Sequence, residues 1–271
     1  MSRIGFVGAG RMGAPMVRRL VEAGHEVYAL GRTPDKREAV AALGAHPVAE
    51  AAAAARDADA VLVCVFTDEQ VRRVCLDDGL AAAVPSGSAL VLHTTGSPRT
   101  AEAVAAAAEP RGVAVLDAPV SGGPHDIAAG RVTLFVGGSD AAFARVRPLL
   151  AAYGDPVLHV GRLGDGQRVK LVNNTMFAAQ IGLVAAGLRL GERLGLDEAT
   201  LLEALPQGSA ASRALTSIAM AGSAAAFMGA VAEFIGKDVE VVRRTAAELG
   251  TDLGVLDALV DAARPGGRHP A

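Results

Sequence analysis

The chain has 271 residues, of which 51% are hydrophobic and 20% charged, a composition typical of a globular protein with room for two modest cores. Its net charge of −3 and its aromatic content of 3% provide neither a basic surface nor stacking platforms, so a nucleic-acid partner is not expected. Cys64 and Cys75 lie in apolar and helical stretches, which indicates reduced thiols in a cytoplasmic protein. The sequence contains no cluster of metal-ligating residue types, so no metal is expected.

The first predicted element is a strand, a glycine turn and a helix at residues 4–16. Residues 4–7 are all apolar or glycine and indicate a buried strand, and the apolar residues that follow recur at helical spacing. Gly8 allows a sharp turn, Gly10 allows a pyrophosphate to approach the backbone, and Gly13 allows the helix to pack close to the strand. The pattern predicts dinucleotide binding, with an ordinary glycine turn as the alternative. The residues expected to contact the cofactor here are Gly8, Gly10, Arg11, Met12 and Gly13.

The second predicted strand, at residues 25–30, is followed by a basic turn. A site for NAD would place an acidic residue at this point to hold the ribose 2′-hydroxyl, whereas this chain has Arg32. Arg32 suits a 2′-phosphate, Lys36 adds positive potential, and Thr33 begins the next helix. The turn therefore predicts NADP, with NAD less favoured and a solvated basic turn as the alternative.

Short apolar runs then alternate with helical segments. Further strands are predicted at residues 60–66, 89–92, 113–116, 132–136 and 157–160. The helices between them are predicted to begin at residues 34, 49, 68, 97 and 139. This alternation predicts an α/β domain with a doubly wound parallel sheet over residues 1–162.

Residues 163–264 show helical periodicity only. A long helix is predicted from residue 166, and others from residues 197, 209, 230 and 252, which gives an all-α second domain joined by the long helix. Residues 265–271 are expected to form a flexible tail. The most apolar segment, 176–188, is too short to cross a bilayer, so no membrane partner is expected. The many alanines and few charges indicate a surface for assembly into a homo-oligomer.

Polar residues and glycines crowd into residues 117–124, directly after a predicted strand. In an open parallel sheet, ligands bind beyond the carboxyl ends of the strands, so this loop is expected on the side of the site. The Ser121 hydroxyl and the N–H groups of Gly122 and Gly123 are suited to hold a carboxylate. A tight turn without a ligand is the alternative.

A second polar segment, residues 164–174, begins the long helix. Lys170 and Asn174 are four residues apart, so their side chains share one helix face. A lysine near the start of a helix opposes the helix dipole, which indicates a role other than stability, although a solvated surface lysine has the same pattern. Lys237 and Asp238 interrupt a later apolar helix and by themselves indicate an exposed charge pair.

Taken in order, the glycine turn, the loop at 117–123 with 132–138, the 170–174 segment and the Lys237–Asp238 pair resemble the β-hydroxyacid dehydrogenase family. This group includes 3-hydroxyisobutyrate dehydrogenases and glyoxylate/succinic semialdehyde reductases, and the resemblance covers nearly the whole chain. It implies a Rossmann domain followed by a helical domain, through which dimers or tetramers assemble. It also implies an NADP-dependent oxidoreductase that interconverts a small hydroxy acid or alcohol and its semialdehyde or keto form.

The resemblance also implies roles for individual residues. Lys170 is implied as the catalytic acid or base, since a positioned ammonium can give a proton to the carbonyl oxygen as hydride arrives at carbon. Thr95 is implied beside the nicotinamide, and Lys237 is implied to contact the cofactor. The residues implied to bind substrate are Ser121, Gly122, Gly123, Asn174, Lys237 and Asp238.

Three places depart from the family pattern. Asp126 and Ile127 stand where Gly-Ala is usual, Leu92 stands at a strand end that usually bears an acid, and Ala230 replaces an aromatic residue. The Asp126 carboxylate would repel an acidic substrate, and His125 would offset this when protonated. The substrate is therefore left open among a hydroxy acid, a less acidic or bulkier carbonyl, and an imine.

Two other functions fit the same architecture. An imine reductase-like enzyme usually lacks a lysine at the catalytic position, so Lys170 argues against it. A non-catalytic dinucleotide-binding protein has no need of Lys170, Asn174 and Ser121 together. A 6-phosphogluconate dehydrogenase is excluded, because its much larger helical domain does not fit in this chain.

Overall fold

The computed structural model describes residues 1–262, and the predicted tail at 265–271 lies outside them. The chain divides into two compact units, the first comprising residues 1–170 and the second beginning at Leu171. The sequence sets its boundary eight residues earlier, after residue 162. The first unit thus includes the opening turns of the long helix together with Lys170.

The first unit is built on a nine-stranded sheet with the order β3-β2-β1-β4-β5-β6-β8-β7, and β9 pairs with β8. Its strands are β1 (Arg3–Val7), β2 (Glu26–Leu30), β3 (His46–Val48), β4 (Ala60–Val63), β5 (Ala89–Leu92), β6 (Ala114–Asp117), β7 (Val120–Ser121), β8 (Val132–Gly137) and β9 (Gly154–Gly161). Strands β1 to β6 are parallel throughout, which confirms the predicted doubly wound parallel sheet.

The sheet departs from the predicted parallel pattern at β8. Strand β8 pairs antiparallel with β6 and with β7, and it then pairs parallel with β9. The connection from β6 to β8 holds only a five-residue helix, α7 (Pro124–Ala128), which is too short to carry the chain back along the sheet for another parallel strand. The short strand β7 instead folds back onto β8, and this turn brings Ser121 opposite Thr133.

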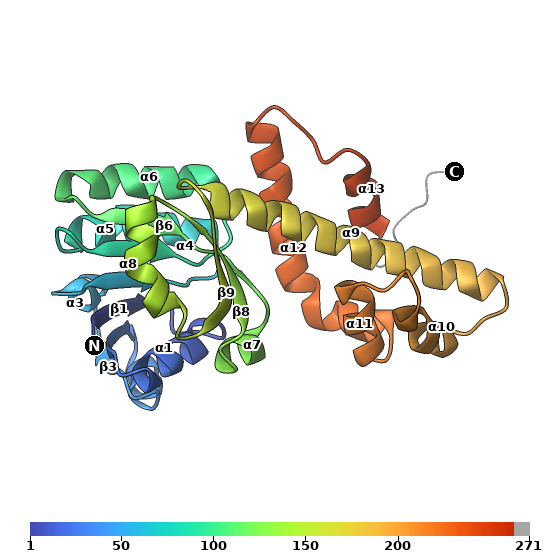
Figure 1. Cartoon of the computed structure of the whole chain (residues 1–271), viewed down its shortest axis with the longest axis horizontal. Helices are drawn as coiled ribbons and strands as arrows, with labels where there is room; N and C mark the ends of the chain where they lie inside the picture. The colour runs from blue at the N-terminus through green and yellow to red at the C-terminus, as the bar shows by residue number, and fades with distance from the viewer. Residues whose placement is uncertain (263–271) are drawn as a thin grey trace. The chain divides into compact units, whose positions relative to one another are not determined.

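Alternate residues of the central strands form two separate cores, one on each face of the sheet. In β4, Leu62 belongs to one core, and Val61 and Val63 belong to the other. Helices α1, α2, α7 and α8 cover the first face, and α3 to α6 cover the second (Figure 1). Strands buried on both faces explain the continuous apolar runs in the sequence.

Half of the eight helices that precede α9 in the first unit begin with hydroxyl caps. They are α1 (Gly13–Glu22), α2 (Pro34–Ala41), α3 (Ala51–Ala55), α4 (Asp68–Arg72), α5 (Leu80–Ala83), α6 (Pro98–Ala108), α7 and α8 (Asp140–Leu150). Thr33, Ser97 and Ser139 cap α2, α6 and α8. A π-helical turn at Arg73–Asp77 extends α4, and a 3₁₀ turn at Glu109–Arg111 follows α6.

One expected cap is wrong. Thr67, and not Asp68, caps α4, because the Thr67 hydroxyl accepts the N–H of Gln70 while the Gln70 side chain reaches back to Thr67. Asp68 lies one position further on and is buried, where it accepts hydrogen bonds from the Ser97 N–H at the end of the loop after β5 and from the Thr100 hydroxyl in the first turn of α6. The neighbouring threonine, which completes a capping box, frees the aspartate for this second role.

The second unit is helical, as predicted. Its helices are the continuation of α9 (Asp165–Arg193), then α10 (Glu198–Ala204), α11 (Arg213–Met220), α12 (Ala224–Glu248) and α13 (Val255–Ala262), with a 3₁₀ turn at Leu205–Gln207. Helix α12 begins six residues before the expected position, because Ser223 provides its cap. Helix α11 begins later than expected, after the Ser212 cap. The largest core of the second unit includes Ile181 and Leu215.

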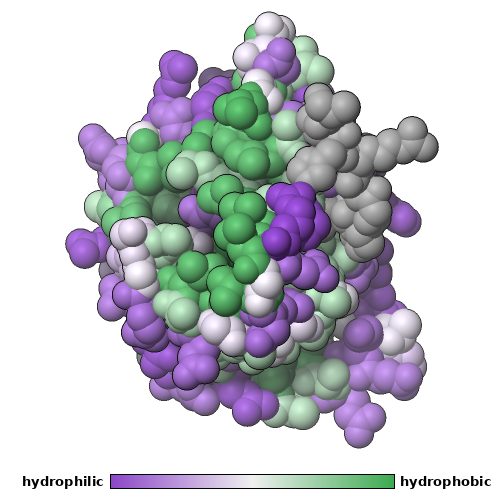
Figure 2. All heavy atoms as spheres, turned by 90° about the vertical axis from the view of Figure 1, so that its right-hand side faces the viewer, coloured by the Kyte–Doolittle hydropathy of each residue, from purple (hydrophilic) through white to green (hydrophobic). Residues whose placement is uncertain are grey.

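Helix α9 carries a row of exposed apolar side chains within the second unit. The row comprises Val172, Met176, Leu183 and Leu190, with exposed fractions of 61%, 50%, 59% and 50%. At 100° per residue these four side chains lie within a sector of about 40°. Figure 2 shows apolar surface gathered on the face of this unit that includes the C-terminal end of α9.

Helix α9 is longer than the apolar segment at 176–188 that the sequence marks. Of the residues that the structure describes, α9 is long and apolar enough to cross a membrane, and the bent pair α11 and α12 passes the same test together. Length and composition alone are weak evidence of a span, because the core helix of a soluble protein has the same properties.

Candidate functional site

The glycine turn between β1 and α1 has the geometry expected of a dinucleotide cradle. Gly8 has a φ of +103°, and a Cβ there would collide with the Cys64 carbonyl oxygen. A Cβ on Gly13 would collide with the Gly8 carbonyl oxygen, whereas a Cβ on Gly10 would meet no atom within 4 Å. The first and third glycines therefore allow tight packing, and the second leaves open space beside the backbone.

Helix α1 begins beside this open space. Its first residues follow Met12, and no side chain caps them, in contrast to the hydroxyl caps of α2, α6 and α8. Uncapped N–H groups at a helix start attract an anion, because they carry partial positive charge and need acceptors. The residues at this turn therefore fit the pyrophosphate of a dinucleotide.

The basic turn after β2 lies at the carboxyl edge of the same sheet. Arg32, Thr33 and Lys36 are all exposed, and the Thr33 hydroxyl accepts the Lys36 N–H at 3.3 Å. The Arg32 guanidinium lies 3.3 Å from a carboxylate oxygen of Asp78, a residue that sequence reasoning did not single out. Both side chains are about half exposed, so the ion pair is a weak one that a phosphate can displace.

The loop after β5, which contains Thr95, is held from two sides. The Gln167 side chain accepts the N–H of Gly96 at 2.9 Å and donates to the carbonyl oxygen of Thr94 at 2.8 Å. The Asp68 carboxylate accepts the N–H of Ser97 at 3.0 Å. The backbone on both sides of Thr95 is thus fixed, and Thr95 itself is 9% exposed.

The end of β6 is tied to the start of α9 by one buried carboxylate. Asp117 is fully buried, and its two oxygens accept the N–H groups of Gly164 at 2.7 Å and Gln167 at 2.6 Å. Burial raises the pKa of Asp117 to about 6, against the opposing effect of these two hydrogen bonds. Asp117 therefore anchors the first turn of α9. The sequence alone indicates it only as the first residue of the polar segment 117–124.

Lys170 lies on α9 one turn after Gln167 and is 8% exposed. Side chains three residues apart share a face of a helix, so Lys170 lies on the face from which Gln167 reaches the Thr94–Gly96 backbone. Asn174 follows on that face one turn later. The first unit thus brings Lys170 to the side of the loop that carries Thr95.

A buried histidine supports the segment that leads to Ser121. His93 Nδ1 lies 2.7 Å from the Ala118 carbonyl oxygen, and His93 Nε2 lies 2.9 Å from the Tyr153 hydroxyl. Burial lowers the pKa of His93 to about 4, so the ring is neutral, with Nδ1 donating to Ala118 and Nε2 accepting from Tyr153. No periodic signal in the sequence connects these two residues.

The predicted substrate loop has one N–H already engaged. Gly122 has a φ of +139°, and the Gly123 N–H donates to the Asp126 carboxylate at 2.7 Å. The Asp126 side chain is 17% exposed, and His125, which is 81% exposed, lies 3.4 Å from the same oxygen. Of the other departures from the family pattern, Leu92 is a core residue on its face of the sheet.

The remaining predicted residues lie together in the second unit. Asn174 donates to Asp238 at 2.6 Å, and the Lys237 ammonium lies 2.9 Å from the other oxygen of Asp238. The side-chain amide of Asn173 donates to the side-chain amide oxygen of Asn174, Oδ1, at 3.0 Å. Lys237 and Asp238 are about 20% exposed, so this pair is more buried than the exposed charge pair that the sequence indicates.

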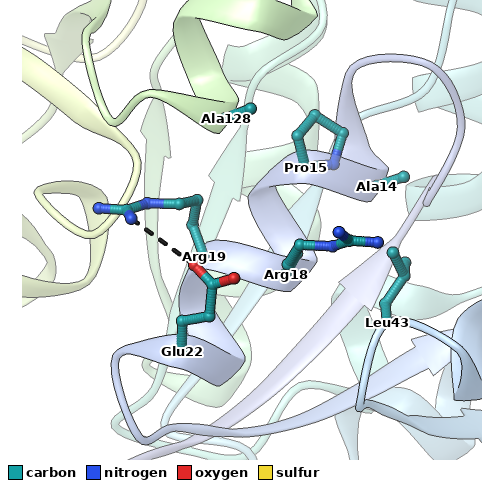
Figure 3. Close-up of a pocket in the computed structure, with 7 residues that line it drawn as sticks. All are labelled: Ala14, Pro15, Arg18, Arg19, Glu22, Leu43 and Ala128. Carbon is teal, nitrogen blue, oxygen red and sulfur yellow. Dashed lines mark ion pairs between the residues drawn. The ribbon is translucent and has the colours of Figure 1, made fainter.

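The described residues also form a pocket of about 240 Å³ on the outer face of α1, which none of the predicted site residues line (Figure 3). Arg18 and Arg19 flank it, and Arg19 pairs with Glu22 at 3.6 Å. Its lining comprises Ala14, Pro15, Arg18, Arg19, Glu22, Leu43 and Ala128. The described residues include no group of three or more His, Cys, Asp or Glu side chains able to hold a metal ion.

Comparisons with known proteins cover both units. Residues 3–161 match the family described as the NAD binding domain of 6-phosphogluconate dehydrogenase. Residues 164–267 match the family described as "NAD-binding of NADP-dependent 3-hydroxyisobutyrate dehydrogenase".

Individual relatives agree with these families. A 3-hydroxyisobutyrate dehydrogenase from Pseudomonas aeruginosa is 37% identical over 216 residues, which are 79% of this chain and 72% of that protein. The structure of Mycobacterium tuberculosis 3-hydroxyisobutyrate dehydrogenase with L-serine is 30% identical, with a TM-score of 0.73 over 98% of this chain and all of that one. An imine reductase from Streptomyces aurantiacus, at 23% identity and a TM-score of 0.67 over 94% of this chain and 92% of that one, shares the fold alone. With a family match over more than half of its length and relatives of this similarity, the chain belongs to the β-hydroxyacid dehydrogenase family of NAD(P)-dependent oxidoreductases.

Proposed function

We propose that this chain interconverts a small hydroxy acid or alcohol and its semialdehyde or keto form, with NADP(H) as cofactor and Lys170 as the acid/base. The observation that carries the proposal is the placement of Lys170, a lysine with 8% exposure, one turn after the glutamine that holds the loop around Thr95. A lysine enclosed beside a loop at the carboxyl edge of the sheet is a candidate for acid/base chemistry.

The cofactor fits the carboxyl edge of the parallel strands. The open space at Gly10, the uncapped start of α1 and the fixed loop around Thr95 lie after β1 and β5. When bound, a reduced nicotinamide supplies the hydride that converts a carbonyl carbon into an alcohol carbon. Thr95 would then lie beside the nicotinamide, and Arg11, Met12 and Gly13 beside the pyrophosphate.

Lys170 completes the reaction. As the carbonyl carbon accepts hydride, the carbon–oxygen double bond becomes a single bond, and the oxygen takes a proton from the Lys170 ammonium. In the direction of oxidation, the neutral amine accepts the hydroxyl proton. In the first unit the proposed substrate contacts are Ser121, Gly122 and Gly123. The second unit has its own proposed contacts, the hydrogen-bonded group of Asn174, Lys237 and Asp238.

The choice of NADP depends on the turn after β2. Arg32 stands where a carboxylate would select the ribose 2′-hydroxyl of NAD, and Lys36 lies one turn away on α2. Arg32 forms a weak surface ion pair with Asp78, so a 2′-phosphate has to displace the Asp78 carboxylate from the guanidinium. This competition predicts a preference for NADP that the Asp78 carboxylate moderates.

A panel of carbonyl compounds tests the function and the cofactor together. We expect the protein to oxidise NADPH with small aldehydes or keto acids, and faster than NADH at equal concentration. Replacing Arg32 with Ser removes a charge-assisted contact and is expected to raise KM for NADPH by roughly 10- to 100-fold, with little change for NADH. Asp78→Asn, which frees Arg32, should lower KM for NADPH by a few fold. Steady-state kinetics with each cofactor provide the measurement.

Arg18→Ser is the matched control, because Arg18 is an exposed arginine on the outer face of α1 (Figure 3). An equal rise in KM for NADH and for NADPH in Arg32→Ser would contradict the role of Arg32. Activity restricted to cyclic imines would favour the imine reductase alternative. Cofactor binding without turnover of any carbonyl or imine would favour a non-catalytic protein.

We also propose that the chain assembles into a homo-oligomer, a dimer or tetramer, through the exposed row on α9. Met176, Leu183 and Leu190 recur every seven residues, the spacing at which one helix packs along another. Gly187 lies within this stretch, and a Cβ there would meet no atom within 4 Å, so a neighbouring helix can approach the backbone. Within this family a second copy of the chain is the simplest partner.

Placing a charge in the row should separate the subunits. We expect Leu183→Glu to convert the oligomer into a monomer, because desolvating a carboxylate in an apolar interface costs several kcal/mol. Light scattering after gel filtration gives the mass. Leu249→Glu is the control, since Leu249 is equally exposed, at 59%, but lies at the end of α12. A monomeric wild-type protein would contradict the proposal.

The state of the two cysteines supports a cytoplasmic location. Neither Cys64 nor Cys75 forms a disulfide in the described part of the chain, and burial raises the pKa of the Cys75 thiol to about 12. Cysteines that remain outside disulfides are typical of a reducing compartment.

A further inference from the structure

The Gln167 side chain is buried, at 3% exposed, and both ends of its amide are hydrogen-bonded. The amide oxygen accepts the Gly96 N–H at 2.9 Å, and the amide nitrogen donates to the Thr94 carbonyl oxygen at 2.8 Å. Because a main-chain N–H can only donate and a carbonyl can only accept, one orientation of the amide satisfies both groups. The two bonds therefore fix the main chain on each side of Thr95 relative to Gln167.

The turn of α9 that carries Gln167 is itself fixed against the sheet. The Asp117 carboxylate accepts the N–H groups of Gly164 and of Gln167. A Cβ on Gly166 would lie 2.5 Å from the carbonyl oxygen of Phe135, so the main chain of the helix lies directly against β8. The Gln167 side chain thus extends from a main chain whose position the sheet determines.

Other hydrogen bonds of the same loop run to different elements. The Thr94 hydroxyl accepts the Val65 N–H and donates to the Val65 carbonyl oxygen. The Asp68 carboxylate on α4 accepts an N–H at the end of the loop. These bonds hold the loop against α4 and the segment that precedes it. The Gln167 bonds, by contrast, tie the loop to α9, the helix that carries Lys170 three residues later.

From this arrangement we infer that Gln167 is a positioning residue, which sets the distance and angle between the Thr95 loop and the Lys170 side chain. The inference rests on the proposed function, in which the nicotinamide lies beside Thr95 and Lys170 exchanges the proton. Hydride and proton go to the two atoms of one carbonyl group, so their sources have to stay aligned to within about 1 Å. Stability alone requires partners for two buried main-chain groups, but not that both partners belong to one side chain a single turn before Lys170.

Replacing Gln167 with Met keeps the length of the side chain and removes both bonds. We expect the rate of hydride transfer in a single turnover, per bound NADPH, to fall about 10- to 100-fold with the carbonyl compound that the wild-type protein reduces fastest. The Kd for NADPH should change by less than about threefold, because the proposed pyrophosphate and 2′-phosphate contacts lie on other elements. With NADPH deuterated at the transferred position, the isotope effect on kcat should rise, since hydride transfer becomes the slow step.

Gln70→Met is the matched control for lost stability. The Gln70 amide oxygen also accepts main-chain N–H groups, those of Phe66 and Thr67, and its replacement removes the capping box of α4. We expect this variant to have a lower Tm and a hydride-transfer rate within about twofold of the wild-type rate. Gln167→Asn keeps the amide but shortens the side chain by one methylene group, so it should show the same loss of rate and serves as the test where Gln167→Met does not fold.

A double variant separates positioning from general damage to the fold. In Lys170→Met the proposed proton donor is absent and its alignment no longer matters, so adding Gln167→Met should lower the rate further by less than about threefold. Losses that multiply in the double variant, or an unchanged hydride-transfer rate in Gln167→Met, would overturn the inference while leaving the oxidoreductase intact. An unimpaired Lys170→Met variant, or no oxidation of NADPH with any carbonyl, would overturn the proposed function, and the inference with it.

Discussion

Replacing Lys170 with Met is expected to lower kcat for carbonyl reduction by at least about 100-fold, since it removes the proposed proton donor and leaves a side chain of similar length. The Kd for NADPH should change by less than about threefold, because the predicted cofactor contacts lie on other elements. Lys170→Arg keeps the positive charge but cannot release a proton near neutral pH, so it should be impaired to a similar degree. Rapid-mixing measurements of a single turnover isolate the chemical step.

Arg168→Met is the matched control for this experiment. Arg168 lies two residues earlier on α9, is 39% exposed, and pairs with Asp165 and Glu102 at the surface. We expect its replacement to leave kcat within about twofold, in line with the small worth of surface ion pairs. An active Lys170→Met variant would contradict the assignment of Lys170, and restoration of activity in Lys170→Arg would indicate that charge alone is sufficient.

Replacing Asp117 with Asn is expected to lower the free energy of unfolding of the first unit by about 2 kcal/mol at pH 8. The carboxylate accepts two N–H groups from the start of α9, and an asparagine offers one acceptor and one donor in its place. One buried N–H is left without an acceptor. Amide hydrogen exchange of Gly164 and Gln167 should accelerate in the variant, and chemical denaturation gives the free energy.

The same carboxyl predicts a pH dependence with a definite sign. The pKa of Asp117 is raised to about 6 in the folded protein, mainly by burial, whereas an unfolded aspartate has a pKa of about 4. The part of the stability that depends on protonation of Asp117 is therefore fully present below about pH 4 and is lost as the pH rises through about 6, whereas the two hydrogen bonds that the carboxylate accepts remain at pH 8. As the pH rises from about 4 to about 6, the free energy of unfolding of the wild-type protein should fall relative to that of Asp117→Asn. The difference between the two proteins should therefore become smaller by on the order of 1–3 kcal/mol.

Asp165→Asn controls for charge at the helix start, because Asp165 lies in the same turn of α9 but is 29% exposed. Replacing Asp165 should lower the free energy of unfolding by less than about 1 kcal/mol and leave the pH dependence of stability between pH 4 and 6 unchanged. If the difference in free energy of unfolding between the wild-type protein and Asp117→Asn stays constant through pH 6, the raised pKa of Asp117 is contradicted.

Most of the fold was accessible from the sequence because its signals are local. Strands β1, β4 and β5 are continuous apolar runs, and hydroxyl residues mark the starts of several helices, including Ser97 for α6. The antiparallel pairing of β8 was not accessible, because it depends on how far a five-residue helix can carry the chain. Strand β3 was missed, since its three residues include a proline and show no alternation.

The site was accessible only in part for a related reason. Glycine geometry at Gly8 and Gly13 follows from the local chain, and the basic turn at Arg32 follows directly from residue type. Asp117 and Gln167, by contrast, act through partners 47 to 73 residues away. His93 reaches Tyr153 across 60 residues. A single sequence shows no period or spacing that joins such pairs, because only the folded sheet brings them together.

Gln167 holds the loop after β5 through the main chain of the loop, so this support does not depend on the side chains that the loop carries. The side-chain amide of Gln167 behaves like a peptide group of an adjoining strand, since it hydrogen-bonds one N–H and one carbonyl of the loop. Thr94 and Gly96 are constrained further, by bonds to Val65 and by the closeness of Asp68. Thr95 lies between them, and its side chain takes no part in these bonds. Evolution can therefore exchange the residue at this position, and with it the chemistry offered at the proposed cofactor site, while the scaffold stays the same.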